Sequence, residues 1–168
     1  MGDQNFKRSV VLMIEHTHDG AIGLVLNQAT GTTTQEILPE WSLYANPIPE
    51  IFIGGPVEPN SCLALGRFLG EVDTGHQFIF ANVGIIDLSS DPDNLPDSLS
   101  EMKIFSGYSG WGPMQLDSEL AVDAWFVVDA DPFDVFSSNH DELWSLVLRR
   151  QKGPMAWLAN YPEDPKLN

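Results

Sequence analysis

One stretch constrains the fold of this chain more than any other, residues 107–120 (GYSGWGPMQLDSEL). Its closely spaced glycines suit an unusual backbone path or a close approach of another chain segment. Pro113 fits the first turn of a helix, where its missing N–H costs nothing. Gln115 and Glu119 lie one helical turn apart and therefore share one helical face. The stretch predicts a loop that enters a helix over about residues 113–121.

This junction has two interpretations. A glycine-rich entry into a helix can bind an anion through the backbone N–H groups of the first turn. Alternatively, the junction is only a tight turn, whose Gln115 and Glu119 side chains cap or bridge the neighbouring loops. Short glycine motifs are common, so the residues favour the structural interpretation. Trp111, which lies between two glycines, is expected to line a pocket or to plug one.

The composition indicates one globular domain over residues 1–168, with frayed ends at 1–5 and 160–168. Acidic residues outnumber basic residues by 24 to 8, and the charge of −16 repels nucleic acid and anionic membranes at long range. Neither a run of about 18 apolar residues nor a signal peptide is visible, so we expect no membrane segment. The single cysteine, Cys62, has no disulfide partner within the chain, which predicts a cytoplasmic location.

Apolar runs bounded by turn signals predict several strands. Residues 8–14 and 21–26 flank the turn pair Asp19 and Gly20, so they predict a hairpin. Further strands are predicted at 51–53, 62–65, 78–83, 103–105 and 124–128. Helices are predicted at 35–38, 113–121 and 140–151, with a short helix near 95–102 and one more helical turn at 155–158. Strands and helices do not alternate regularly. The pattern therefore predicts an α+β fold with a mixed, mainly antiparallel sheet flanked by three or four helices.

None of the familiar catalytic or cofactor motifs occurs in the chain. His16 and His18 are expected at a hairpin end facing water, and their spacing matches no strong metal motif. Cys62 lies in an apolar run and is expected to be buried and inert. No nucleophile elbow, phosphate-binding loop or dinucleotide fingerprint is present. The residues therefore predict no catalytic residue, no metal and no cofactor.

A second glycine motif follows the strand predicted at 51–53. Gly54 and Gly55 could offer two backbone N–H groups to an anion or to an oxyanion. The alternative is a sharp bend at the end of a strand, which is a common role of a glycine pair. The residues favour the bend.

Taken together, these motifs resemble the YqgE/AlgH family of bacterial proteins. The matching pieces are FxxSVV at 6–11 with Glu15 and His16, GLVLN at 23–27, GGPV at 54–57, the stretch 107–120, and Trp125. They span about residues 6–126, and Trp144 fits the family's C-terminal helix. Each piece is short, but the combination is specific.

Two departures from the family pattern matter. Family members usually carry an upstream segment of the type GxLLxAxP, which this sequence lacks. We expect either a shortened N-terminus or a start assigned too late, and a missing strand would leave an exposed sheet edge. Many members also have Leu-His after the GGPV motif, where this chain has Leu65 and Gly66. A role of that histidine therefore cannot be transferred to this chain.

The resemblance implies a single-domain α+β fold with a barrel-like mixed sheet, and no established reaction. The family is often labelled as transcriptional regulators. The first functional hypothesis is therefore a non-catalytic binding or regulatory module with a protein or small-molecule partner. Direct nucleic-acid binding is not expected, because the chain is acidic and no DNA-binding motif is readable.

The second hypothesis is an enzyme or a small-ligand binder. Its candidate pocket combines polar and glycine residues at predicted strand ends and at a helix start, where binding sites commonly form. The candidates are Glu15, His16, Asn27, Gly54, Gly55, Trp111, Gln115 and Glu119. If they form a site, they should converge on one cavity.

Overall fold

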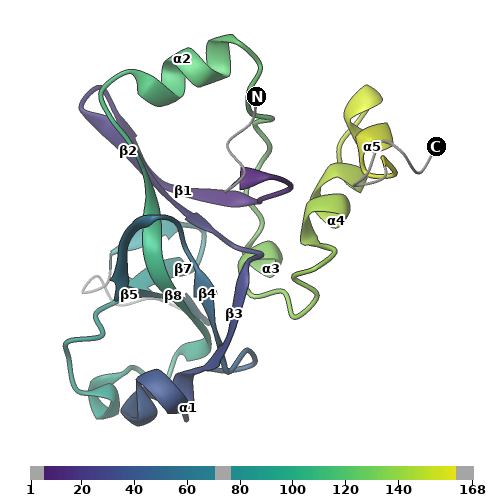
Figure 1. Cartoon of the computed structure of the whole chain (residues 1–168). Coiled ribbons are helices and arrows are strands. Elements are labelled where there is room, and N and C mark those ends of the chain that lie inside the picture. Colours follow the sequence, from purple (N-terminus) through teal and green to yellow (C-terminus); the bar gives the residue numbers. More distant parts are fainter. Residues whose placement is uncertain (1–5, 71–76, 162–168) are drawn as a thin grey trace.

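The sheet is built around one long strand, β8 (Leu99–Trp111). The computed structural model describes residues 6–70 and 77–161, and eight strands form one sheet within it (Figure 1). The strand order is β1-β2-β8-β5-β7-β6, while β4 pairs with both β3 and β8. The β4–β8 pair is parallel and the other strand pairs are antiparallel. The predicted mixed, mainly antiparallel and barrel-like sheet is thus confirmed.

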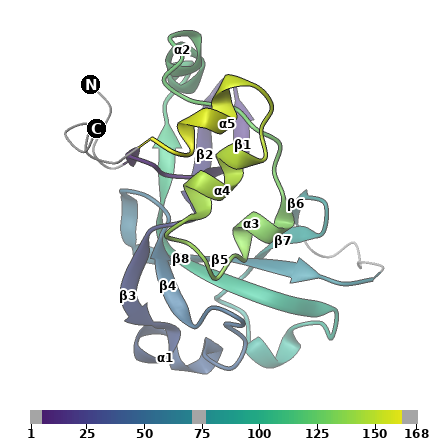
Figure 2. The same cartoon turned by 90° about the vertical axis from the view of Figure 1, so that its right-hand side faces the viewer.

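The other strands are β1 (Val11–Thr17), β2 (Gly20–Val25), β3 (Ala29–Thr33), β4 (Glu50–Ile53), β5 (Val57–Phe68), β6 (Phe78–Phe80) and β7 (Val83–Ile86). The helices are α1 (Thr34–Ile37), α2 (Gln115–Ala121), α3 (Pro132–Val135), α4 (Leu143–Arg149) and α5 (Pro154–Leu158), with short 3-10 turns at Pro39–Trp41 and Pro92–Asn94. Figure 2 shows α3, α4 and α5 on one side of the sheet, and α2 lies beyond the β1–β2 hairpin. No helix in this described part of the chain is long and apolar enough to cross a membrane.

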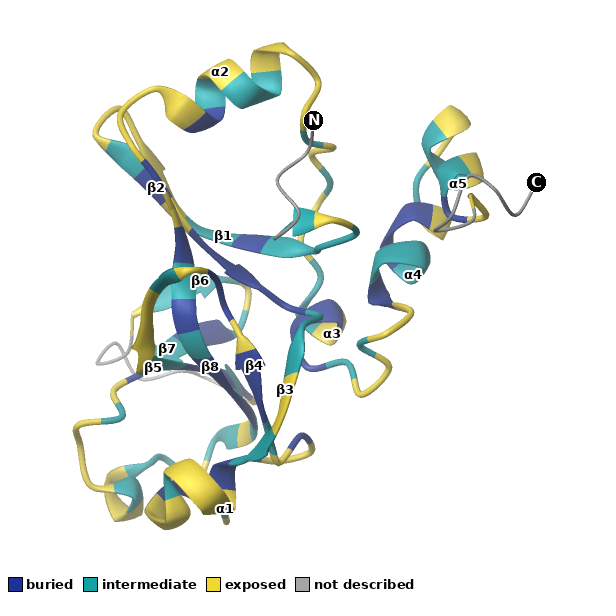
Figure 3. Cartoon of the chain, in the orientation of Figure 1, coloured by how far each residue is buried: buried dark blue, intermediate teal, exposed yellow. Residues whose placement is uncertain are grey.

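Three groups of buried side chains hold these layers together. The largest lies between the sheet and helices α3 and α4, and includes Leu12, Phe105 and Val147. A second group surrounds Trp41 on the opposite side of β8. A third, smaller group places Trp111 beneath α2. Burial is therefore concentrated along β2, β4 and β8, whereas the outer faces of α1 and α2 are exposed (Figure 3).

Glycines allow the chain to cross itself beside β8. A Cβ atom on Gly54 would lie 2.3 Å from the carbonyl oxygen of Gly107, and one on Gly55 would lie 2.3 Å from the nitrogen of Ser109. Gly107 has a φ of 65°, in the left-handed region that glycine adopts readily. The glycines of both motifs thus serve a close backbone approach, which was one interpretation of the glycines at 107–112 and was not foreseen for Gly54 and Gly55.

The hairpin predicted at 8–26 is confirmed as β1 and β2, and the predicted helix after Pro113 is confirmed as α2. That helix begins at Gln115 rather than at the proline, because Met114 has a left-handed φ of 60°. The short helix predicted near 95–102 is wrong, since Leu99 already begins β8.

The strand predicted at 124–128 is also wrong. Residues 124–130 form no regular element, and within the described chain no backbone hydrogen bond involves residues 125–130. The residues have the expected strand propensity, but a strand also needs a neighbour to pair with. Of the ends predicted to fray, 1–5 and 160–168, all but residues 160 and 161 lie outside the described residues.

Candidate functional site

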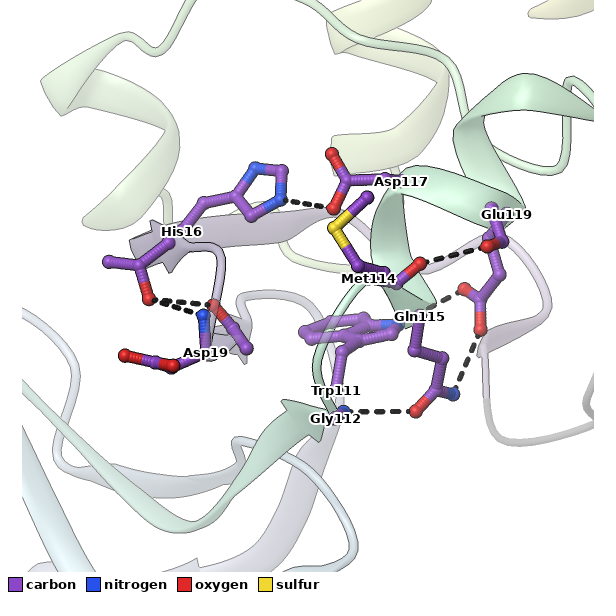
Figure 4. A network of polar contacts seen from close by, with 11 residues as sticks. His16, Asp19, Trp111, Gly112, Met114, Gln115, Asp117 and Glu119 are labelled. Atoms are coloured by element: carbon purple, nitrogen blue, oxygen red, sulfur yellow. Dashed lines mark hydrogen bonds and ion pairs between the residues drawn. The ribbon is translucent and has the colours of Figure 1, made fainter.

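A hydrogen-bond network joins the end of β8 to α2, and Glu119 is its centre (Figure 4). One Glu119 oxygen, Oε2, accepts from Nε1 of Trp111 at 3.0 Å and from Nε1 of Trp125 at 2.7 Å. The other, Oε1, accepts from Nε2 of Gln115 at 3.0 Å. Gln115 in turn accepts from the backbone N–H of Gly112 at 3.0 Å. In the glycine-rich segment before α2, the N–H of Gly112 is thus already bound by a side chain of the helix itself.

These contacts also set the charge state of Glu119. Partial burial raises the pKa of Glu119, but hydrogen bonds from Trp125, Gln115 and Trp111 outweigh it and leave that pKa below its usual value. The carboxylate is therefore ionised at neutral pH. Both of its oxygens already accept hydrogen bonds from the protein.

Trp111 plugs the space beneath α2. Its exposed fraction is 7%, and its ring stacks on Phe6 with 6.0 Å between centroids. Trp125 meets both rings edge-on, at 5.4 Å from Phe6 and 5.9 Å from Trp111. The three rings and the Glu119 carboxylate hold α2 and the segment after it against the β1–β2 hairpin.

His16 makes a second link between the hairpin and α2. Its Nε2 lies 3.2 Å from Oδ2 of Asp117, as Figure 4 shows. The two side chains are 36% and 43% exposed, so this surface pair contributes little to stability. His16 and His18 both face water, as predicted. Glu15 pairs with Ile22 in the β1–β2 ladder, and its exposed side chain makes no hydrogen bond to any described residue.

Asn27 and the Gly54–Gly55 pair fix the backbone. Asn27 accepts from the N–H of Val10 and donates to the carbonyl of Arg8, both at 2.9 Å, so it clamps the chain that leads into β1. The Gly54 N–H donates to the carbonyl of Ser106 at 2.9 Å and is not available to an anion. The carbonyl of Gly54 accepts from the hydroxyl of Ser109 at 3.0 Å.

A cavity of about 1000 Å³ lies between α2, β1 and α4, and we call it the α2 cavity. Four of the eight candidate residues line it: His16, Trp111, Gln115 and Glu119. The other four do not: Glu15, Asn27, Gly54 and Gly55. Pro56 borders the cavity, so the 54–57 loop and the 107–120 stretch do meet there. The structure therefore brings together half of the candidate set.

Several residues of the α2 cavity were not foreseen from the sequence. Phe126 and Val127 line it with exposed fractions of 54% and 75%. Arg8 lies over the ring of Trp144, 4.7 Å from its centroid, and both residues line the cavity. The run of apolar residues at 124–128 was the available signal, but it predicts a buried strand rather than an exposed wall.

Two further groups lie outside the cavity. Lys103 is fully buried in β8, where its Nζ donates to the carbonyl of Leu26 at 2.6 Å and lies 3.8 Å from the centroid of Phe52. Burial lowers the pKa of Lys103 to about 7. Cys62 is only half-buried in β5, in contrast to the expected full burial, and this burial raises the pKa of its thiol.

The chain resembles known bacterial proteins along nearly its whole length. A family model described as AlgH-like matches residues 1–156. A UPF0301 protein of Streptomyces coelicolor is 40% identical over 173 residues, covering 100% of this chain and 90% of that protein. A UPF0301 protein of Rhodococcus erythropolis is 39% identical over 168 residues, covering 97% and 83%.

Two solved structures share the fold. A crystal structure of a protein from Corynebacterium diphtheriae superposes with a TM-score of 0.89 at 28% identity, covering 96% of this chain and 86% of that chain. The solution structure of the AlgH protein from Pseudomonas aeruginosa superposes with a TM-score of 0.67 at 25% identity, covering 98% and 89%.

Proposed function

The chain belongs to the AlgH-like family, and from this premise we propose that it is a cytoplasmic regulatory module that binds a partner protein in the α2 cavity and catalyses no reaction. The single cysteine supports the cytoplasmic location, since no disulfide can form within the chain.

One observation carries the proposal: four polar side chains that line the α2 cavity, those of Trp111, Gln115, Glu119 and Trp125, are bound to one another. Glu119 is the carboxylate among the described residues that line it, and it accepts three hydrogen bonds from Trp111, Trp125 and Gln115. A general base needs a lone pair directed at its substrate and a pKa near the working pH. Three acceptor sites of Glu119 are occupied by protein donors and its pKa is lowered, which makes it a poor general base. The cavity otherwise offers mainly apolar and aromatic surface, which suits binding.

We propose that regulation proceeds through protein contact rather than through DNA. The net charge of −16 opposes approach to a phosphate backbone. The helices of the described chain have at most seven residues, which is short for a recognition helix. An electrophoretic mobility assay at low salt with promoter fragments should give no shift. A salt-dependent shift would contradict this part of the proposal.

A small-ligand binder is the second candidate, because Pro56, Trp111 and Gln115 line one cavity. Its volume of about 1000 Å³ lies at the upper end of the range for small-molecule pockets. A small molecule that purifies with the protein and is lost when Phe126 is replaced by Asp would favour this candidate over a protein partner.

Site-specific cross-linking in the native bacterium tests the proposed function. A photoreactive amino acid is placed at Phe126, which lines the α2 cavity, or at the control position Leu43, which is 82% exposed and lies outside it. We expect one protein to cross-link at position 126 and not at position 43. Cross-links that are absent at position 126, or equal at both positions, would overturn the proposal.

A further inference from the structure

One edge of the sheet ends at β1, which pairs only with β2 among the described strands. The carbonyl of Val10 accepts from the N–H of Leu26 at 2.8 Å. Backbone groups alternate in direction along an antiparallel strand, so those of Val11 and Met13 point to the outer side of β1. No described residue outside the β1–β2 ladder makes a backbone hydrogen bond to them. With respect to residues 6–70 and 77–161, the outer edge of β1 is therefore open for pairing.

A second unpaired segment faces this edge. Residues 124–128 (AWFVV) have strong strand propensity, yet residues 125–130 make no backbone hydrogen bond within the described chain. Figure 2 shows the chain between α2 and α3 running beside β1. Phe126 and Val127 are exposed although both are large and apolar.

Two cavities separate β1 from this segment. The α2 cavity contacts residues 124–128, and a smaller cavity of about 200 Å³, which we call the α3 cavity, contacts residues 128–131. Both cavities are lined by Val10, Val11, Met13, Val128 and Val147. Together they form one trough, which we call the β1 trough, with an open strand edge on one side and an unpaired segment on the other.

We infer that the β1 trough accepts one extended segment of a partner protein, which adds as a strand between β1 and residues 124–128. This inference rests on the proposed function and names the form of its partner. Strand addition satisfies the backbone groups on both walls of the trough and is an established mode of peptide recognition.

The trough also specifies the side chains of that strand. On one face of β1, Val11 and Met13 pack toward Trp111 beneath α2. On the other face, Val10 and Ile14 pack toward the group that contains Val147. A strand inserted beside β1 meets apolar surface on both faces, so it should be a continuous apolar, β-branched run of about five residues.

Charge at the trough suggests what flanks this run. Lys7 and Arg8 line the α2 cavity, although basic residues number only 8 in a chain of charge −16. Asp129 lines the α3 cavity and has no ion-pair partner among the described residues. A segment with an acidic residue at one end and a basic residue at the other complements the trough.

The test uses a synthetic peptide of five alternating Val and Ile residues with Glu at one end and Lys at the other, made in both orders. Binding to the full chain is measured by NMR titration, and we expect one peptide per chain from the tighter order. Two derivatives carry N-methyl groups on alternate backbone nitrogens, one set for each side of the strand. Each set should weaken binding at least about tenfold, because each removes ladder hydrogen bonds. If only one set of N-methyl groups weakens peptide binding, or neither does, the peptide does not pair with both walls and the inference is overturned.

Matched protein variants locate the binding. Val127→Asp places a charge in the trough, whereas Val122→Asp changes an equally exposed valine outside it, at 74% against 75% exposure. We expect only Val127→Asp to lose the peptide, with both variants folded by circular dichroism. Equal binding by both variants, or a dimer in sedimentation that Val127→Asp dissociates, would overturn the inference. If a partner cross-links at position 126 but the peptide does not bind, the proposed function stands and strand addition is ruled out.

Discussion

The β8–α2 junction and the β1 trough lie side by side and differ in how completely they are satisfied. At the junction, both oxygens of Glu119 and the side-chain amide of Gln115 have partners within the fold. In the trough, the outer edge of β1 and residues 125–130 make no backbone hydrogen bonds to described residues. The comparison teaches that the most recognisable motif of this chain fixes the fold, while the binding that we propose uses a plainer stretch beside it.

The largest effect is expected where the two glycine motifs cross. Gly55→Ala should destabilise the chain by more than about 4 kcal/mol, because its Cβ would meet the Ser109 nitrogen at 2.3 Å. Gly31→Ala is the matched control, since Gly31 also has a positive φ, of +79°, but nothing lies within 4 Å of a Cβ there. Urea unfolding should give a loss of only about 1 kcal/mol for the control. Similar losses in unfolding free energy for the two variants would show that the close backbone contact at Gly55 does not stabilise the fold.

The next effect concerns the carboxylate that closes the junction. Glu119→Ala leaves two indole N–H groups without their acceptor and should cost about 3 kcal/mol in the free energy of unfolding. Asp117→Ala on the same helix removes only the surface pair with His16 and should cost less than about 1 kcal/mol. Equal costs in chemical unfolding would mean that the network does not hold α2.

A smaller, pH-dependent effect is expected from Lys103, in the same strand as the junction. Burial lowers its pKa from the ordinary value of 10.5 to about 7, so the folded chain binds fewer protons than the unfolded chain between these values. Stability should therefore rise with pH across this window. Lys103→Met should flatten that rise and add about 2 kcal/mol at neutral pH, as followed by thermal unfolding. A rise that persists in the variant would assign the pH dependence to another group.

The smallest effect on stability is expected in the trough. Val127→Asp should change the free energy of unfolding by less than about 0.5 kcal/mol, because the side chain is 75% exposed and its backbone is unpaired. A decrease of more than about 2 kcal/mol in the free energy of unfolding would show that Val127 is part of the core. The trough and the junction would then not differ in how completely the fold satisfies them.

The sequence predicted the elements whose causes are local. The β1–β2 hairpin follows from two apolar runs around Asp19 and Gly20, and α2 follows from the proline and helical spacing after Trp111. The Gly54–Gly55 pair indicated a sharp bend, and the chain does reverse there, because β4 runs parallel to β8 and β5 runs antiparallel to it.

The remainder depends on contacts between distant parts of the chain. Residues 124–128 have strand propensity, but no described strand lies close enough to pair with them, which no local pattern reveals. Asn27 was a candidate ligand residue, yet it clamps the backbone of Val10 and Arg8. Burial of Lys103 was not foreseen, because it depends on which strands flank β8.

Amide hydrogen exchange tests the contrast between the two regions most directly. In the chain alone, the amides of residues 125–128 and the outward amides of Val11 and Met13 should exchange almost without protection, while those paired within β8 exchange slowly. Addition of the apolar peptide should protect residues 125–128 and the outer edge of β1 together. Protection of residues 125–128 in the chain alone, or a peptide that protects neither wall of the trough, would contradict the account.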